Sequence, residues 1–234
     1  MTWEELRADI CRRLDESVEL VVAGDGMWSD EDLRWWSNDG LKDIGQRLMV
    51  HRDEKSYDTV ADQSEYDMPE DMVKLYRLEY RQSDSYMVTL EYMQLLMFDD
   101  VRGVMRGNSG FPSAFSTWGY PGGGGKIVLD RAPSESRTDG LRLYYYRLPR
   151  MIQADSDPID LPAGWERLVS HYVEWNARRK EARDNRWREA QQLYEAGLEE
   201  MRKVAVQHSD QPSFFSDGGY GRASAIFGSA DDYY

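Results

Sequence analysis

The chain has one cysteine, Cys11, and three histidines among its 234 residues. A single cysteine excludes an internal disulfide framework and a cysteine-only zinc site, and it is typical of a protein made in a reducing cytosol. The histidines, His51, His171 and His208, are too scattered to form a recognisable metal-binding motif. We therefore expect no metal site and no bound cofactor.

Long apolar runs are also lacking. No segment approaches 18 consecutive apolar residues, so we expect no membrane span. The first residues, Met-Thr-Trp-Glu-Glu, have neither the basic start nor the apolar run of a secretory signal.

Basic residues are few relative to acidic ones, with 29 Lys and Arg against 43 Asp and Glu. The net charge of −14 argues against a conventional nucleic-acid-binding face. It is compatible with a protein that lets nucleic acid pass without holding it. The excess acid lies in residues 1–162, which carry a net charge of −12, whereas residues 163–206 carry +1 and residues 207–234 carry −3.

Aromatic residues are abundant for a polar chain, with 15 Tyr, 8 Trp and 6 Phe. Hydrophobic residues make up 41%, which is enough for a folded core. Aromatic side chains with a polar group are enriched at interfaces. The composition therefore indicates a subunit of an assembly.

Residues 1–53 have the pattern of a helical hairpin. Thr2 with Glu5, and Ser29 with Asp32, are capping-box pairs that predict two helix starts. Apolar residues recur at helical spacing from Leu6 to Val21, and glycines follow from Gly24. A short turn between two amphipathic helices predicts antiparallel packing.

Residues 54–161 change to strand patterns. Alternation over 73–80 and the runs 126–130 and 141–146 predict strands. The polar, turn-rich stretch 133–140 is interpreted as the connection between the last two. The short apolar run 87–90 is interpreted as a second strand or as the lead into a short helix near 92–98. This region is predicted to be a small antiparallel sheet or sandwich inserted into the helical part.

Residues 162–206 have helical periodicity again, over roughly 60 Å if they form one long helix. The charged stretch 178–186 interrupts the apolar stripe and is interpreted as a bend or a solvated segment. We predict an α+β fold in which this helix completes a helical bundle. The predicted bundle core is Leu6, Ile10, Leu14, Leu33, Trp36, Leu41, Ile44, Trp165, Leu168 and Tyr172.

The C-terminal segment 207–234 is rich in Ser, Gly and Asp, yet it carries spaced apolar residues. Such a segment is best explained as an extended tail that orders on a partner. A cloning remnant, or a tail folded back on its own domain, are the alternatives. The anchors predicted to bind the partner are Phe214, Phe215, Tyr220, Ile226, Phe227, Tyr233 and Tyr234.

The sequence contains only incomplete versions of motifs that are typical of enzymes. The run Gly122, Gly123, Gly124, Gly125 before Lys126 resembles a phosphate loop, but Tyr120 and Ile127 stand where that motif needs Gly and Ser or Thr. We interpret the glycines as a flexible loop, or a hinge beside a moving partner. The paired acids 99–100 and 231–232 lack the accompanying residues of a metal or acid–base site. We therefore expect no catalytic residues.

Three stretches carry a resemblance to a known family. They are Tyr-Asp-Met-Pro-Glu-Asp at 66–71 leading into a strand, Leu-Tyr-Tyr-Tyr-Arg-Leu-Pro at 143–149, and Asp-Pro-Ile-Asp-Leu-Pro at 157–162 before a long helix. With the N-terminal helical hairpin, this layout resembles the head-to-tail adaptor, or connector, proteins of tailed bacteriophages, including the tail tubular protein A class. The resemblance covers roughly residues 3–205.

The resemblance implies a non-enzymatic virion protein. Such adaptors form a ring, usually of twelve copies, below the portal protein, and they join the capsid vertex to a tail nozzle or tail tube protein. Genomic DNA passes through the channel without specific binding, and a C-terminal extension commonly reaches onto the portal. Two alternatives stay open at this point. One is another neck or tail completion protein, such as a stopper, and the other is a soluble enzyme or ligand-binding domain.

Overall fold

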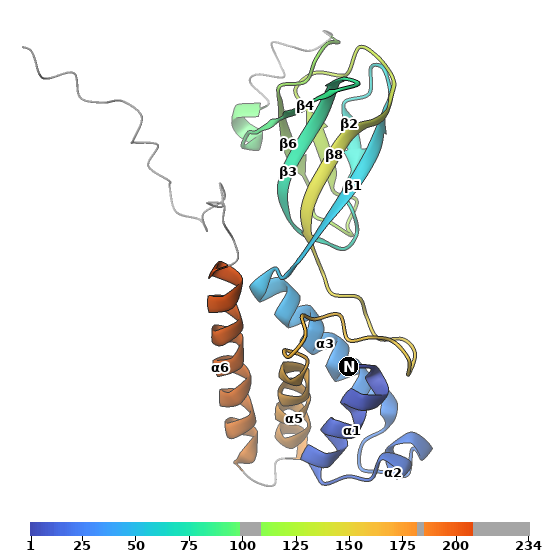
Figure 1. Ribbon diagram of the computed structural model, residues 1–234, viewed down its shortest axis with the longest axis vertical. Coiled ribbons are helices and arrows are strands. Elements are labelled where there is room, and N and C mark those ends of the chain that lie inside the picture. Colours follow the sequence, from blue (N-terminus) through green and yellow to red (C-terminus); the bar gives the residue numbers. More distant parts are fainter. Residues whose placement is uncertain (99–108, 182–184, 208–234) are drawn as a thin grey trace, which may run out of the picture.

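The structure is a computed structural model that describes residues 1–98, 109–181 and 185–207. Helices gather at one end of this part of the chain and two β-sheets at the other (Figure 1). The fold is therefore mixed α+β, as the sequence predicts. None of the helices described is both long enough and apolar enough to cross a membrane.

The N-terminal segment forms α1 (Trp3–Leu14), α2 (Val18–Ala23) and α3 (Asp30–Leu48). Both predicted capping boxes are confirmed, at Thr2 with Glu5 and at Ser29 with Asp32. The predicted single helix up to Gly24 is wrong, because the helix ends after Leu14. Asp15 adopts a left-handed conformation there, with φ of 58°. An Asp tolerates this conformation better than most residues.

The predicted single long helix at 162–206 is also wrong. The chain forms α5 (Arg167–Glu181) and α6 (Arg186–Gln207), which lie side by side as a hairpin (Figure 1). The rings of Tyr172 and Tyr194 are 5.2 Å apart, whereas a continuous helix would separate these residues by roughly 33 Å. The reversal lets the apolar stripes on both sides of the charged stretch pack against each other.

The first sheet has the order β1-β8-β3-β4 and is antiparallel throughout. Its strands are β1 (His51–Thr59), β8 (Arg137–Arg147), β3 (Met72–Ser83) and β4 (Tyr86–Thr89). The second sheet has the order β2-β7-β6-β5, and its β5–β6 pair is parallel. Its strands are β2 (Glu65–Asp67), β7 (Lys126–Leu129), β6 (Ala114–Trp118) and β5 (Glu91–Tyr92).

The connection predicted for strands 126–130 and 141–146 does not make them partners. β7 pairs with β2 and β6 in the second sheet, whereas β8 pairs with β1 and β3 in the first. A buried cluster from both sheets holds them together, and it includes Tyr66, Leu78, Phe115, Leu129 and Leu143. β8 also begins at Arg137, inside the stretch interpreted as a loop.

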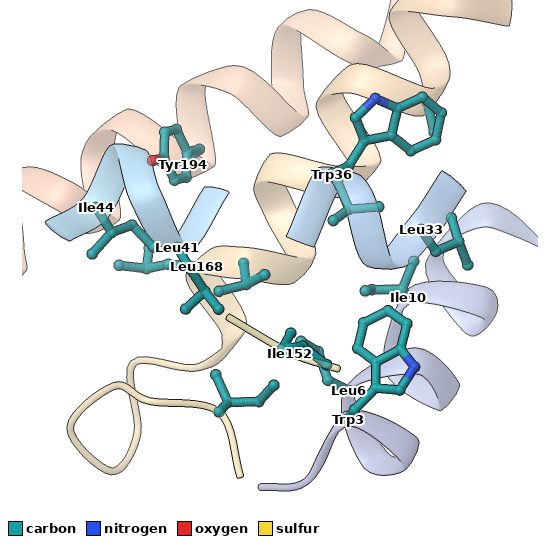
Figure 2. Packing of buried hydrophobic residues seen from close by; sticks show 14 of the residues in the cluster. Trp3, Leu6, Ile10, Leu33, Trp36, Leu41, Ile44, Ile152, Leu168 and Tyr194 are labelled. Atoms are coloured by element: carbon teal, nitrogen blue, oxygen red, sulfur yellow. The ribbon is translucent and has the colours of Figure 1, made fainter. Parts of the chain in front are cut away.

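A second buried cluster lies among the helices (Figure 2). Every residue predicted for the bundle core lies in it, except Trp165 and Tyr172, which are half-buried and pack against it. The cluster also takes Ile152, Ile159 and Leu161 from the segment that returns from β8 to α5. That segment, residues 148–166, is called the strap below. The strap therefore packs its apolar side chains into the helical cluster and links that cluster to the end of β8.

Candidate assembly surfaces

A network of two arginines and two aspartates fixes the strap to the helices. Arg7 on α1 is buried, and its Nη1 lies 2.8 Å from Oδ1 of Asp30 and 3.3 Å from Oδ2 of Asp155. Arg34 on α3 reaches the same two carboxylates at 2.7 and 2.8 Å. A buried guanidinium needs such partners, because leaving one charge unpaired there is strongly destabilising. These residues therefore hold the helical end together as one body.

The Asp-Pro-Ile-Asp motif of the strap provides further fixed contacts. Oδ2 of Asp157 accepts hydrogen bonds from the backbone N–H groups of Gln153 and Ala154, both at 2.8 Å. Asp160 accepts from Arg147 Nη1 at 2.6 Å and from the Arg150 N–H at 2.8 Å. The first aspartate shapes the strap, and the second attaches it to the last residue of β8.

The Tyr-Asp-Met-Pro-Glu-Asp motif has an analogous role in the sheets. Tyr66 is buried between the two sheets, and Asp67 beside it is exposed and paired with Lys126. Asp71 accepts a hydrogen bond from the Tyr145 hydroxyl at 3.2 Å. The motif thus connects β2, β3, β7 and β8, which gives it a structural rather than a chemical function.

Carboxylates on α3 bind the tyrosines of the α5–α6 hairpin. The hydroxyl of the buried Tyr194 donates to Oδ2 of Asp43 at 2.6 Å, and the hydroxyl of Tyr172 donates to Asp39. Burial, followed by the neighbouring carboxylates, raises the pKa of both phenols well above the usual value. Both phenols therefore stay protonated donors at every physiological pH.

The glycine run forms a hydrogen-bonded turn. The N–H groups of Gly123 and Gly125 both donate to the Tyr120 carbonyl, at 3.1 and 3.0 Å. Gly122 and Gly124 have φ of 71° and 77°, a conformation that other residues rarely adopt. The side chains of Trp118 and Tyr120 beside this turn are 61% and 83% exposed. These aromatic residues are groups that suit contact with a partner. The mobility of the glycine loop and its contact with a partner stay predictions.

Sequence reasoning did not single out these exposed side chains. Trp35 on α3 and Leu96 and Met97 after β5 are exposed as well. The available signal was the pair of aromatic residues in the Trp-Gly-Tyr-Pro stretch before the glycine run, because connecting segments lie mostly at the surface.

The two histidines in the described residues, His51 and His171, have different partners. His51 Nε2 lies 2.8 Å from the Asp160 carbonyl, and His171 lies beside Arg13 on the helical end. Burial, followed by the charge of Arg13, lowers the pKa of His171. In the described ranges no group of three or more His, Cys, Asp or Glu residues could hold a metal ion.

Apart from Gln207, which ends α6, the predicted partner-binding tail lies outside the described residues. This applies to Phe214, Phe215, Tyr220, Ile226, Phe227, Tyr233 and Tyr234, and also to His208 and the acid pairs. Its assignment as a binding segment therefore stays a prediction.

Exposed aromatic side chains on a well-packed α+β body are typical of a subunit of a larger assembly. A comparison with protein families identifies the kind of assembly to which the subunit belongs. Residues 1–216 match the family described as SU10 adaptor protein. The chain therefore belongs to the SU10 adaptor protein family, which makes it a structural adaptor protein of a bacteriophage. No curated protein matches it.

Proposed function

We propose that this protein forms the ring that joins the portal vertex of a phage capsid to the tail. Membership of the adaptor family is the observation that carries the proposal. The ring contains about twelve copies, by resemblance to connector proteins, and its partners are the portal protein above and a tail nozzle or tail tube protein below. The protein is accordingly a component of the virion, and its work is done by contact rather than by catalysis.

Two features of the molecule support this function. The exposed Trp118 and Tyr120 offer contact groups of the type found in protein interfaces. In a closed ring each subunit presents two different faces to its neighbours. One buried cluster packs the helices and another packs the two sheets, so each part presents a defined surface.

The net charge of −14 has a function in this arrangement. A channel wall made of repeated acidic subunits repels the phosphate backbone, so DNA passes without the counterion release that drives ordinary binding. We propose that acidic residues of 1–162 face the channel.

The tail provides the test of portal docking. Deletion of residues 212–234 is expected to leave a folded protein, because both buried clusters lie within residues 3–201. We expect that the truncated chain no longer co-sediments with portal rings, whereas the full chain does. Normal co-sedimentation of the truncated chain contradicts the docking role of the tail.

Order of assembly separates an adaptor from a stopper. An adaptor binds purified portal rings directly, whereas a stopper needs another ring first. Failure of the full chain to bind portal in the absence of other neck proteins would favour the stopper.

A further inference from the structure

The outer side of the first sheet carries a surface that differs from the rest of this acidic protein. Along β8, Leu141, Leu143 and Tyr145 point into the buried cluster, so Arg142, Tyr144 and Tyr146 point outward. The cross-strand partners of these outward residues lie on the same side. We call this surface the cationic sheet face; its cationic and aromatic residues are Arg52, Lys74, Tyr76, Arg77, Arg142, Tyr144 and Tyr146.

Tyrosine rings hold two arginines of this face in position. The guanidinium of Arg52 lies 5.4 Å from the ring of Tyr76 and 5.6 Å from the ring of Tyr146. The guanidinium of Arg77 lies 4.4 Å from the ring of Tyr144. Stacked guanidinium groups lose less conformational freedom when they bind a carboxylate. The face is therefore organised for binding before a partner arrives.

The charge of the face is opposite to that of the chain. Cross-strand pairing adds the acids Glu54 and Glu79, and Glu79 is paired with Arg77 at 3.2 Å. Four cationic residues still outnumber these two acids on a chain with a net charge of −14. Every other copy of the chain therefore offers surfaces of complementary charge.

None of the described helices or strands lies over the cationic sheet face. In Figure 1 the strands β1, β8 and β3 lie in front, and the second sheet covers only their opposite side. Tyr and Arg are enriched at the centres of protein interfaces.

We propose that the cationic sheet face binds an acidic surface of a second copy of this chain and forms one side of the lateral contact in the ring. The inference rests on the proposed ring. A nucleic-acid phosphate backbone is a poorer match, because Glu54 and Glu79 lie among the cationic groups. Carboxylates of a neighbouring copy meet the arginines while the tyrosine rings supply apolar contact area.

Photo-crosslinking between copies tests this contact. The Ser56→Cys variant places a thiol on the face, because Ser56 is exposed and lies opposite Arg142. The natural Cys11 is buried, so a thiol-reactive photo-crosslinker attaches at position 56 alone. Equal amounts of ¹⁴N- and ¹⁵N-labelled protein are mixed, assembled on portal rings and illuminated. We expect crosslinked peptides that join one light and one heavy chain and that contain Asp or Glu residues.

Charge reversal provides the matched comparison. The variant Arg52→Glu with Arg77→Glu places like charges across the contact, and we expect it to lower the yield of light–heavy crosslinks by about tenfold or more. Arg12→Glu with Arg179→Glu makes the same change of charge at exposed helical positions and is expected to preserve the yield. An equal loss in both variants contradicts a specific contact at the face.

The remaining outcomes separate this inference from the proposed function. If the protein binds portal rings but crosslinks form only within one chain or to portal, the inference is wrong and the adaptor function stands. If the protein neither binds portal nor associates with itself, the proposed function is contradicted and the inference falls with it.

Discussion

Asp160 lies where the strap meets the sheet. Burial raises the pKa of its carboxyl group, but hydrogen bonds from Arg147 and from the Arg150 N–H outweigh this effect, and the pKa is lowered. A lowered pKa in the folded state means that the carboxylate stabilises the protein above the unfolded value of 3.8. That stabilisation is lost as the pH falls through the folded-state pKa.

We predict that Asp160→Asn lowers the free energy of unfolding at pH 7 by about 1.5–3 kcal/mol, as expected for lost hydrogen bonds to a charged group. The difference in unfolding free energy from the unmodified protein should shrink below about pH 4. There the Asp160 carboxyl of the unmodified protein is protonated in the unfolded chain, which reduces the stabilisation that its lowered folded-state pKa provides. Urea unfolding at a series of pH values measures both effects.

Asp67→Asn is the control for this measurement. Asp67 also has a lowered pKa, through its pair with Lys126, but its side chain is exposed. Exposed ion pairs contribute little to stability, so this variant should unfold like the unmodified protein. The role of Asp160 is refuted if the two variants behave alike.

At the scale of the helices, two glycines permit close packing. A Cβ atom on Gly45 of α3 would lie 2.3 Å from Cδ of Pro149, and one on Gly197 of α6 would lie 2.2 Å from Cδ2 of Leu168. The proline belongs to the strap and its ring is rigid, whereas the leucine can change rotamer. The two sites therefore differ in how well a methyl group can be accommodated.

We predict that Gly45→Ala destabilises the protein by about 1–3 kcal/mol, the usual effect of overpacking. In an isolated helix the same change would be stabilising by about 1 kcal/mol, so the sign of the effect reports the contact with Pro149. Gly197→Ala is expected to lower the free energy of unfolding by less than Gly45→Ala does, because Leu168 can change rotamer. Thermal unfolding of the two variants measures both effects. A Gly45→Ala protein whose melting temperature equals or exceeds that of the unmodified protein contradicts the close contact with Pro149.

The sequence predicted those elements whose signals are local. The capping boxes at Thr2 and Ser29 marked two helix starts, because the bonds that they make span three residues. The strand at 73–80 was recognised within β3, since alternate residues such as Leu78 and Tyr80 enter the core. Local chemistry was sufficient in each case.

Features set by distant contacts were missed. The apolar stripe has the same period in one long helix as in the α5–α6 hairpin, so periodicity did not reveal the reversal. β1 has few buried residues and is stabilised by pairing with β8 along one edge. The stacking of Arg52 and Arg77 on tyrosines depends on pairing between strands far apart in the sequence. No local sequence motif predicts such pairing.

At the scale of the whole molecule, the distribution of charge is the feature to explain. The helical core is crossed by arginine–aspartate pairs that neutralise each other, such as Arg7 with Asp30. The cationic sheet face concentrates positive charge on a protein whose net charge is −14. In a ring, contact between this face and a neighbour would bury cationic groups and leave the excess acid on the free surfaces, where it repels DNA.

The most direct test of the adaptor function is a cryo-electron microscopy reconstruction of the phage neck with the symmetry counted. We predict that this chain forms a closed ring between the portal and the tail, with neighbouring copies in contact through the first sheet and acidic residues of 1–162 facing the channel. A chain that lies below another ring, or that is absent from the particle, contradicts the adaptor function.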